Sequence, residues 1–544
     1  MDIPYNKLPG YNQLFIDYIN DYDIVSQFYE YNFNDINSFK KSIEERHRIY
    51  KIDRKEISKI LAYQNKSFNS SGKAFENIEK LNSENTFAVV TGQQIGLLTG
   101  NYYTIIKAVN AIQLSDFLSE KMPEYNFVPV FWLECDDHDF LEINNINIFD
   151  KNNEIVNLKY FEKGTEKEKY IQPVGTIIAD ETMELLINEI FLNLLPSEFS
   201  DELSEYTKRI YKAGLDLKTS FGRYLNYLLK DGGLILLDPT DKEIKKKLLP
   251  VFEKELNTFP HSCELMIDAS DKLELRYEPQ IKPKPVNLFY LYENGRYLIE
   301  PTQGYSFSLK NTRQKFEKEY IMDNLYSHPE NFSPNVALRP VCQDYILPTV
   351  AYIGGPSEVS YFAQLKSLYR FFNTKMPVIF PRTSVTIIEN RIHNFLLKYD
   401  ISFDQLFDEH LVTNKIMKSL NAVDVEDIFS AFSGSFNGLV YETGNRIRSI
   451  DKNLEILFRN KSAKFTESLD SVKKKLSDTQ IAQNENTIKK LKSIISNVCP
   501  DNYLQERYIN IIYFINKYGN NIINKLFKDI NLFAKGHQNI LISS

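Results

Sequence analysis

Short apolar runs, each bounded by glycine, proline or aspartate, recur through the first 390 residues and predict buried strands. The runs cover residues 87–90, 128–133, 234–237, 349–353 and 377–380. Amphipathic stretches of helix length lie beside most of them, as at 104–121 and 357–372, and a charged helical lead-in covers 36–84. Because buried strands that alternate with helices form parallel sheets, we predict an α/β fold with its ligands at the carboxyl ends of the strands.

Two stretches of the predicted core, residues 1–390, have the character of insertions between its strands. The stretch near 150–230 combines a charged, hairpin-like segment at 163–169 with helices that begin at about residue 181. The stretch near 270–325 contains closely spaced prolines and an aromatic apolar run, which favour strands. We therefore expect a single sheet-based core that is interrupted twice.

From 391 to 500 the pattern changes to long helices whose apolar residues are three and four positions apart, as in coiled coils. Interruptions of this apolar seam near 458–464 and 477–487 predict two or three antiparallel helices rather than one rod. The seam buries either against another helix of the same chain or against a second copy. We expect residues 501–544 to return to the core as helices.

Composition and charge narrow the class of protein. The 544 residues are 43% hydrophobic and 25% charged, which excludes a disordered chain. The net charge of −7 argues against a nucleic-acid backbone or an anionic membrane as the main partner. Four widely spaced cysteines form no CxxC pair, and the sequence has neither a signal-peptide pattern nor a membrane-length apolar run. We expect a cytoplasmic protein.

The first candidate site is the glycine-rich segment 91–104, which follows a predicted strand and precedes a predicted helix. Backbone N–H groups in such a turn can hold a phosphate or a carboxylate. The candidate residues are Thr91, Gly92, Gln93, Gln94 and Gly100. Lys107, one turn into the helix, could neutralise the anion or only extend to solvent. The segment matches neither GxGxxG nor GxxxxGK[ST], and its glycines could serve tight turns alone.

The second candidate site is the acidic sequence ECDDHD at 134–139, at the end of a predicted strand. One use is general acid–base catalysis by His138 and the neighbouring aspartates, and another is a Mg²⁺ ion held by carboxylates. A zinc site would use Cys135 and His138, although the spacing supplies no further ligand pair. The remaining alternative is a capping and salt-bridging cluster at a helix start.

The third candidate site combines Arg339, Gln343 and Asp344 with the turn GGPSE at 354–358. Gly354 and Gly355 precede an amphipathic helix, so this turn is a second candidate anion site, followed by Glu358. Arg339 and Arg382 are the cations best placed to clamp a carboxylate or a phosphate through two hydrogen bonds. Each arginine could instead form a structural ion pair.

In these motifs the chain resembles the bacillithiol synthase (BshC) family of cysteine ligases. The matching motifs, in chain order, are VTGQQxGLxTG at 90–100, PVFW at 129–132, DHD at 137–139, RPVxQD at 339–344, LPTVAY at 347–352, GGPxE at 354–358, PR at 381–382 and LQER at 504–507. Together they extend from about residue 88 to residue 507. One departure is Asp136, where the family usually has glutamate.

The resemblance implies an ATP-dependent ligase that joins the carboxyl group of L-cysteine to the amine of glucosaminyl-malate to form bacillithiol. ADP or AMP would be released, and Mg²⁺ would accompany ATP. The resemblance also implies a Rossmann-like core with connecting-peptide insertions and a coiled-coil domain that forms a homodimer. In this interpretation Asp137, His138 and Asp139 are catalytic. Gln505 and Arg507 either contact the nucleotide or form a hinge ion pair.

Two other interpretations start from the same residues. A metal-dependent hydrolase would use Asp136, Asp137, His138 and Asp139 as ligands and would not need ATP. A nucleotide-sensing coiled-coil interaction protein would bind a nucleotide without turning it over. Neither interpretation requires nucleic acid or a membrane.

Overall fold

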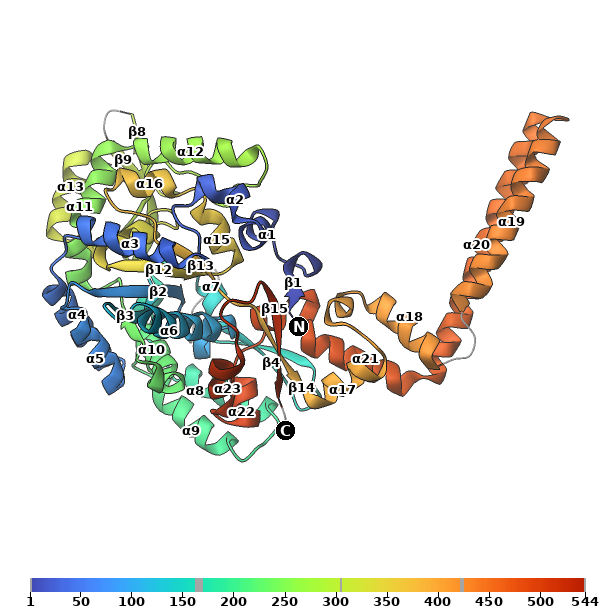
Figure 1. The fold of residues 1–544 in the computed structure, drawn as a ribbon, viewed down its shortest axis with the longest axis horizontal. Coiled ribbons are helices and arrows are strands. Elements are labelled where there is room, and N and C mark those ends of the chain that lie inside the picture. Colours follow the sequence, from blue (N-terminus) through green and yellow to red (C-terminus); the bar gives the residue numbers. More distant parts are fainter. Residues whose placement is uncertain (1, 162–169, 304–305, 421–424, 543–544) are drawn as a thin grey trace. The chain divides into compact units, whose positions relative to one another are not determined.

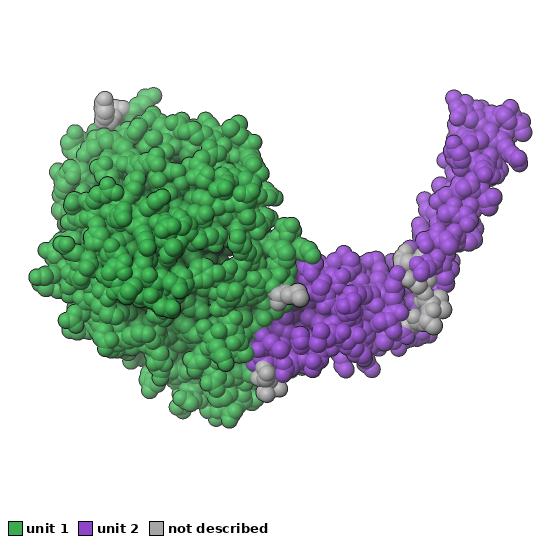
Figure 2. All heavy atoms as spheres, in the orientation of Figure 1, with its two compact units in different colours: residues 1–387, 503–540, 544 green, residues 388–502, 541–543 purple. Residues whose placement is uncertain are grey.

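A computed structural model describes residues 2–161, 170–303, 306–420 and 425–542. The predicted charged hairpin at 163–169 lies outside these described residues. The chain divides into two compact units, shown in different colours in Figure 2. The first comprises residues 1–387, 503–540 and 544, and the second comprises residues 388–502 and 541–543.

The first unit is built on a five-stranded sheet in which every pair of neighbours is parallel. Its strands, in spatial order, are β13 (Val378–Pro381), β12 (Thr349–Gly354), β2 (Thr86–Gln94), β3 (Asn126–Glu134) and β6 (Ile235–Leu237). The parallel sheet predicted from the apolar runs is thereby confirmed. All carboxyl ends meet at one edge, which brings together the residues that end or follow each strand.

The register between β2 and β3 places two polar residues side by side at this edge. The two strands pair without a break from Thr86 opposite Asn126 to Gln94 opposite Glu134. The middle residues of both strands are buried, because helices cover the sheet on both sides. Strands that are buried on both faces have continuous apolar sequences rather than alternating apolar and polar residues. Apart from the exposed first residue of β3, Asn126, only the last residues of each strand reach a partly exposed position.

Helices cover the parallel sheet of the first unit (Figure 1). Helix α6 (Tyr103–Lys121) packs against β2 and β3, and α3 (Ile36–Ile49) packs against β12 and β13. The further helices that flank or follow the strands are α1 (Gln13–Asn20), α2 (Tyr22–Val25), α4 (Arg54–Ser67), α5 (Gly72–Lys80), α7 (Phe140–Ile143), α11 (Lys242–Thr258), α12 (His261–Glu274), α14 (Arg339–Ile346), α15 (Pro356–Phe362) and α16 (Lys366–Phe371). The one helix predicted at 357–372 is therefore two short helices.

In the residues near 150–230 that the structure describes, the chain forms a hairpin and three α-helices. Strands β4 (Asn145–Phe149) and β5 (Ile155–Lys159) form the antiparallel hairpin. The helices are α8 (Thr182–Asn193), α9 (Ser200–Ile210) and α10 (Leu217–Leu228). Helix α10 packs beside the glycine-rich segment through the short 3-10 helix Leu97–Thr99.

The stretch near 270–325 supplies most of a separate antiparallel sheet. Its strands, in spatial order, are β10 (Lys315–Glu317), β9 (Ser306–Leu309), β8 (Gly295–Thr302), β7 (Leu288–Tyr292) and β11 (Phe332–Pro334). Helix α13 (Lys318–Ser327) connects β10 to the short 3-10 helix before β11. Strand β8 carries Arg296, which reaches the candidate site described below.

The second unit is helical, and the part of it that the structure describes has α17 (Asn390–Lys398), α18 (Glu409–Leu420), α19 (Val425–Arg448), α20 (Lys452–Gln483) and α21 (Glu485–Val498). Helices α19 and α20 lie side by side as a hairpin (Figure 1). The predicted interruption at 458–464 is wrong, because α20 runs through it and ends at Gln483. The break before α20 falls at 449–451, where the Asp451 side chain accepts backbone N–H groups of Asn453 and Leu454.

The chain ends with α22 (Ile512–Tyr518), α23 (Asn521–Asp529) and a strand, β15 (Gly536–Ile542), which the helical prediction for 501–544 missed. Strand β15 joins β1 (Ile3–Pro4) and β14 (Val385–Glu389) in a third sheet. Glycine and polar residues at 536–539 hide the start of the strand, which lies between β1 and β14 and pairs with both. Among the described residues, no helix has the length and apolar character needed to span a membrane.

Candidate active site

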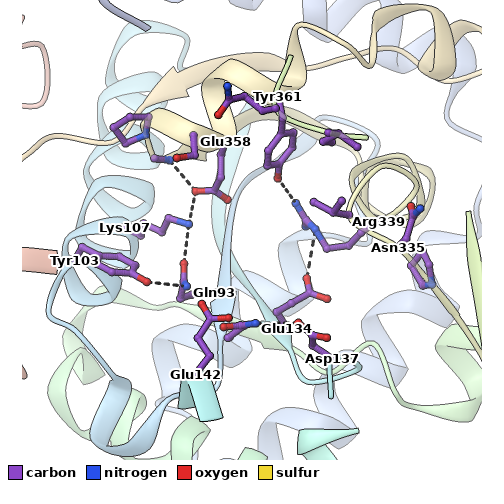
Figure 3. Close-up of a pocket in the computed structure, with 18 of the residues that line it drawn as sticks. Gln93, Tyr103, Lys107, Glu134, Asp137, Glu142, Asn335, Arg339, Glu358 and Tyr361 are labelled. Atoms are coloured by element: carbon purple, nitrogen blue, oxygen red, sulfur yellow. Dashed lines mark hydrogen bonds and ion pairs between the residues drawn. The ribbon is translucent and has the colours of Figure 1, made fainter. Parts of the chain in front are cut away.

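A pocket of about 980 Å³ lies in the first unit at the carboxyl edge of the parallel sheet (Figure 3). Its basic side chains are Lys107, Lys282, Lys284, Arg296, Arg339, Arg382 and Arg507, and its acidic ones are Glu134, Asp137, Glu142 and Glu358. The volume is that of a typical small-molecule site. The excess of basic groups suits a ligand that carries carboxylates or phosphates.

Glu134 and Arg339 form an ion pair in the middle of the pocket (Figure 3). The distance between Oε2 of Glu134 and Nε of Arg339 is 3.3 Å. The other nitrogens of Arg339 donate to Gln343 and to the hydroxyls of Tyr352 and Tyr361, which fix the guanidinium. Burial raises the pKa of Glu134 to about 7, although the Arg339 charge opposes this shift.

Asp137 is held by several donors at the edge of the pocket. Its Oδ1 accepts the backbone N–H of His138 at 2.8 Å and lies 3.2 Å from Nη1 of Arg296, and its Oδ2 accepts from Gln94 at 2.9 Å. Burial alone would raise its pKa, but the hydrogen bonds and the Arg296 charge outweigh burial and hold the pKa well below its usual range. Nδ1 of His138 lies 3.2 Å from the same Arg296 nitrogen.

Lys107 and Glu358 form a second ion pair on the opposite side of the pocket. Lys107 also donates to the carbonyl of Gly92 and to the side chain of Gln93, which in turn donates to the hydroxyl of Tyr103. Glu358 accepts the backbone N–H of Gly355 and the hydroxyl of Tyr352. Burial favours the neutral form of Glu358, but Lys107 outweighs it and keeps the pKa of this carboxyl below its usual range.

Ten of the residues predicted from the sequence line this pocket, and eight do not. Those that line it are Gln93, Gln94, Lys107, Asp137, His138, Arg339, Gly355, Glu358, Arg382 and Arg507. Those outside its lining are Thr91, Gly92, Gly100, Asp139, Gln343, Asp344, Gly354 and Gln505. The three candidate sites therefore converge, but through side chains more than through the predicted backbone cradles.

The predicted backbone cradles are largely occupied by the protein itself. Thr91 donates its hydroxyl to the carbonyl of Ile353, and Gly92 lies inside strand β2 rather than in a turn. The N–H of Gly355 is used by Glu358. Gly100 has a φ of +66°, a conformation that favours glycine, and ends the short 3-10 helix 97–99. Gly355 and Gly100 thus shape turns, which is the alternative to anion binding that the sequence left open.

The acidic sequence 134–139 divides between different surroundings. Asp136 forms a buried ion pair with Lys245 at 2.7 Å and does not line the pocket. Asp139 is exposed and caps α7 by accepting the N–H of Glu142. Within the described ranges, no three His, Cys, Asp or Glu side chains are placed to hold a metal ion. The four metal ligands of the hydrolase interpretation are therefore not brought together in the described residues. Asp136, which stands where the family usually has glutamate, belongs to an ion pair with Lys245 and not to the pocket lining.

The Cys135 thiol likewise does not join His138, because it donates to Asp238 at 3.3 Å. Arg382 meets Glu506 in a buried pair, and Gln505 accepts the hydroxyl of Tyr102. Gln343 and Asp344 are buried behind Arg339, where the Tyr369 hydroxyl donates to Asp344. Arg382 lines the pocket, whereas Glu506, Gln505, Gln343 and Asp344 lie outside its lining.

Sequence reasoning missed several pocket residues, including three basic ones on the insertion near 270–325. Arg296, Lys282 and Lys284 come from that stretch, and its position over the sheet edge has no local sequence signal. In the part of the chain that the structure describes, neither Lys282, Lys284 nor Arg507 forms an ion pair with a carboxylate. Glu134 belongs to the acidic sequence at 134–139 but was not predicted as a site residue. In the structure it lies opposite Gln94 at the end of β3 and lines the pocket.

A parallel-sheet core with a charged pocket at its carboxyl edge, together with a separate helical-hairpin unit, defines a Rossmann-like protein with a coiled-coil domain. Residues 1–383 match the model of the bacillithiol biosynthesis BshC N-terminal Rossmann-like domain, and residues 385–542 match that of the BshC C-terminal coiled-coil domain. The chain belongs to the BshC family.

Two relatives are similar over nearly their whole length. A protein of Chloroherpeton thalassium is 33% identical over 551 residues, which cover 98% of this chain and 97% of that protein. A protein of Salinibacter ruber is 30% identical over 539 residues, with 98% and 97% covered. Both carry the name "Putative cysteine ligase BshC".

Proposed function

We propose that this chain is an ATP-dependent ligase that joins the carboxyl group of L-cysteine to the amine of glucosaminyl-malate, forming the amide bond of bacillithiol. Family membership supports the reaction class, and the charged pocket at the sheet edge is the structural observation that carries the proposal. Each of the three reactants bears carboxylates or phosphates, which matches the excess of basic side chains.

The chemistry requires that a carboxylate, a poor electrophile, first be activated. In the proposal ATP supplies a phosphate or adenylate group to the cysteine carboxyl, and ADP or AMP is the product. The fit of phosphates is supported by Lys282, Lys284 and Arg507, whose charges no carboxylate of the described residues neutralises. Nε of Arg507 is buried without a hydrogen-bond partner among the described residues, so it has a donor to offer.

Mg²⁺ enters this proposal with the phosphates of the nucleotide, whose negative charge it reduces. The described residues supply no cluster of three protein ligands for such an ion. In the proposal the nucleotide phosphates hold the ion, and the basic side chains of the pocket hold the phosphates.

The paired residues of the pocket are proposed to orient the substrates. Asp137 stays ionised, since its pKa is held low, and can bind the ammonium group of cysteine. His138 lies beside it, and Arg339 is fixed by two tyrosines in a position to clamp a carboxylate. Asp139 is exposed at the start of α7, so it has no part in this proposal.

We also propose a homodimer formed by the helical unit in the cytoplasm. The hairpin of α19 and α20 exposes large apolar side chains, namely Ile428, Phe432, Leu439, Leu454, Leu457, Phe465 and Val472. Apolar surface of this kind usually marks an interface. All four cysteines are free thiols, which supports a reducing compartment.

The test incubates purified protein with Mg-ATP, L-cysteine and glucosaminyl-malate, and follows AMP, ADP and the thiol product by mass spectrometry. We expect a cysteine-dependent product, with AMP or ADP identifying the activation step. Asp137→Asn should lower product formation, because the anion that binds the ammonium is lost. Folded protein that forms no product with these reactants would contradict the proposal.

A further inference from the structure

Glu134 occupies the centre of the pocket as the last residue of strand β3 (Figure 3). Its side chain is 24% exposed, so the carboxylate reaches the cavity from an otherwise buried strand. Oε2 is held by Arg339, whereas Oε1 has no hydrogen-bond donor among the residues that the structure describes. One oxygen is therefore anchored, and the other is available to a ligand.

We propose that Glu134 is the general base of the ligase reaction and takes the proton that the amine acceptor loses when the amide bond forms. This assignment rests on the proposed function. It adds a catalytic residue that the motif sequence DHD at 137–139 did not indicate.

Asp137 and Glu358 are less suited to this role because of their partners, and Glu142, whose pKa burial also raises, is the alternative that the experiment below tests. Both oxygens of Asp137 accept hydrogen bonds, from His138, Arg296 and Gln94. Glu358 is bound by Lys107, Tyr352 and the N–H of Gly355. A carboxylate that is stabilised in its ionised form by several donors has little affinity for a further proton.

The electrostatic surroundings of Glu134 support the assignment. Burial and the negative charges of Asp136 and Asp137, in the segment after β3, favour its protonated form. Arg339 on α14 and Arg296 on β8 oppose them, and the balance places the pKa of Glu134 at about 7. A base with this proton affinity is ionised near neutral pH and still binds a proton well, which is the optimum for general base catalysis.

Amide formation displaces the phosphate or AMP from the activated cysteine. The lone pair of the acceptor's neutral amine nitrogen forms a bond to the carbonyl carbon of the activated cysteine, while one N–H proton passes to Glu134. The bond between that carbon and the phosphate oxygen breaks, and its electron pair leaves with the phosphate or AMP. Glu134 then releases its proton to the departing phosphate or to water.

The experiment separates activation from amide formation. Hydroxylamine captures an activated cysteine as the hydroxamate and, being neutral at pH 7, does not need a base of the enzyme. Wild type, Glu134→Gln and Glu142→Gln are each given Mg-ATP and L-cysteine with either hydroxylamine or glucosaminyl-malate. Glutamine retains the size and polarity of Glu134 but cannot take a proton.

We expect E134Q to form hydroxamate at a rate close to that of wild type, and amide about 10²–10⁴-fold more slowly. The rate of amide formation by wild type should rise with pH through about 7. E142Q should keep this pH dependence, because it retains Glu134. Hydroxamate formation by E134Q also shows that the variant is folded.

Two results would overturn the inference. If E134Q forms the amide within about threefold of the wild-type rate, Glu134 is not the base. If wild type keeps its activity unchanged from pH 5 to pH 8, no group with this proton affinity acts in the step. Wild type that forms neither hydroxamate nor amide contradicts the ligase function itself, and the base assignment falls with it.

Discussion

Arg382 and Glu506 are 124 positions apart and form a two-pronged ion pair with almost no exposure to solvent. The two N–O distances are 2.8 and 2.7 Å, and the side chains are 2% and 0% exposed. Glu506 also accepts from the Ser384 hydroxyl and from the backbone N–H of Val385. The pair fastens the segment that begins at residue 503 to the end of the parallel sheet, beside the pocket.

Replacing Glu506 by glutamine should strongly destabilise the protein. The change leaves the Arg382 charge buried without a counter-ion, and such a loss typically costs about 3–5 kcal/mol. Urea unfolding of E506Q measures the difference from wild type. Glu243→Gln is the control, since the Lys246–Glu243 pair is exposed and should contribute less than about 1 kcal/mol. Equal effects of the two changes would contradict the structural role of the buried pair.

Lys107 and Glu358 should be energetically coupled. Lys107→Met leaves Glu358 with two hydrogen bonds but no cation, and Glu358→Gln leaves the buried Lys107 without an anion. We expect each change to cost about 3 kcal/mol, and the double variant K107M/E358Q to cost clearly less than the sum of both. A double-mutant cycle of unfolding free energies measures the coupling. Strict additivity would show that the pair is not an interacting unit.

The exposed apolar side chains of α19 and α20 lead to a prediction about association. Leu439→Lys together with Leu454→Lys places charges on the helical hairpin and should shift the protein from dimer to monomer at micromolar concentration. Sedimentation velocity measures the distribution. Tyr63→Lys alters an even more exposed apolar side chain, which lies in the first unit, and should leave the dimer intact. A wild-type protein that is monomeric at every concentration would contradict the proposed dimer.

The sheet could be predicted because each of its strands is a short apolar run between turn residues, a signal that depends only on local sequence. Strand β15 gave only a weak signal, since its first four residues are glycine and polar residues and it is held between the partner strands β1 and β14. The seam interruptions in α20 misled the prediction for a similar reason. In a two-helix hairpin one face can stay polar, so polar residues at 458–464 do not end the helix.

The sequence predicts only those pocket residues whose position follows from the end of a core strand. Gln94 ends the core strand β2, Lys107 lies in the helix that follows it, and both line the pocket as expected. Their partners could not be predicted, because pairing depends on register and on inserted segments. Arg296 reaches Asp137 from 159 positions away, and Lys245 draws Asp136 out of the acidic sequence from 109 positions away.

The dependence of stability on pH gives a test of the Glu134 environment that does not require activity. In the unfolded chain a glutamate releases its proton near pH 4.5, whereas in the folded protein Glu134 holds it until about pH 7. The folded state therefore binds more protons in this window, and wild type loses stability as pH rises from 4.5 to 7. The shift corresponds to roughly 3 kcal/mol at about 1.36 kcal/mol per pKa unit.

Glu134→Gln removes this titration. The unfolding free energy of E134Q minus that of wild type should therefore increase by roughly 2–3 kcal/mol between pH 4.5 and 7.5. Asp137→Asn is the control with the opposite sign. Because the pKa of Asp137 is lower in the folded protein, Asp137 stabilises the folded state at pH values above its unfolded pKa, and this contribution is lost as pH falls. Urea unfolding at several pH values measures both differences. A difference for E134Q that does not change with pH would show that the folded protein does not favour protonated Glu134, since only an unshifted carboxyl leaves the two states with equal numbers of bound protons.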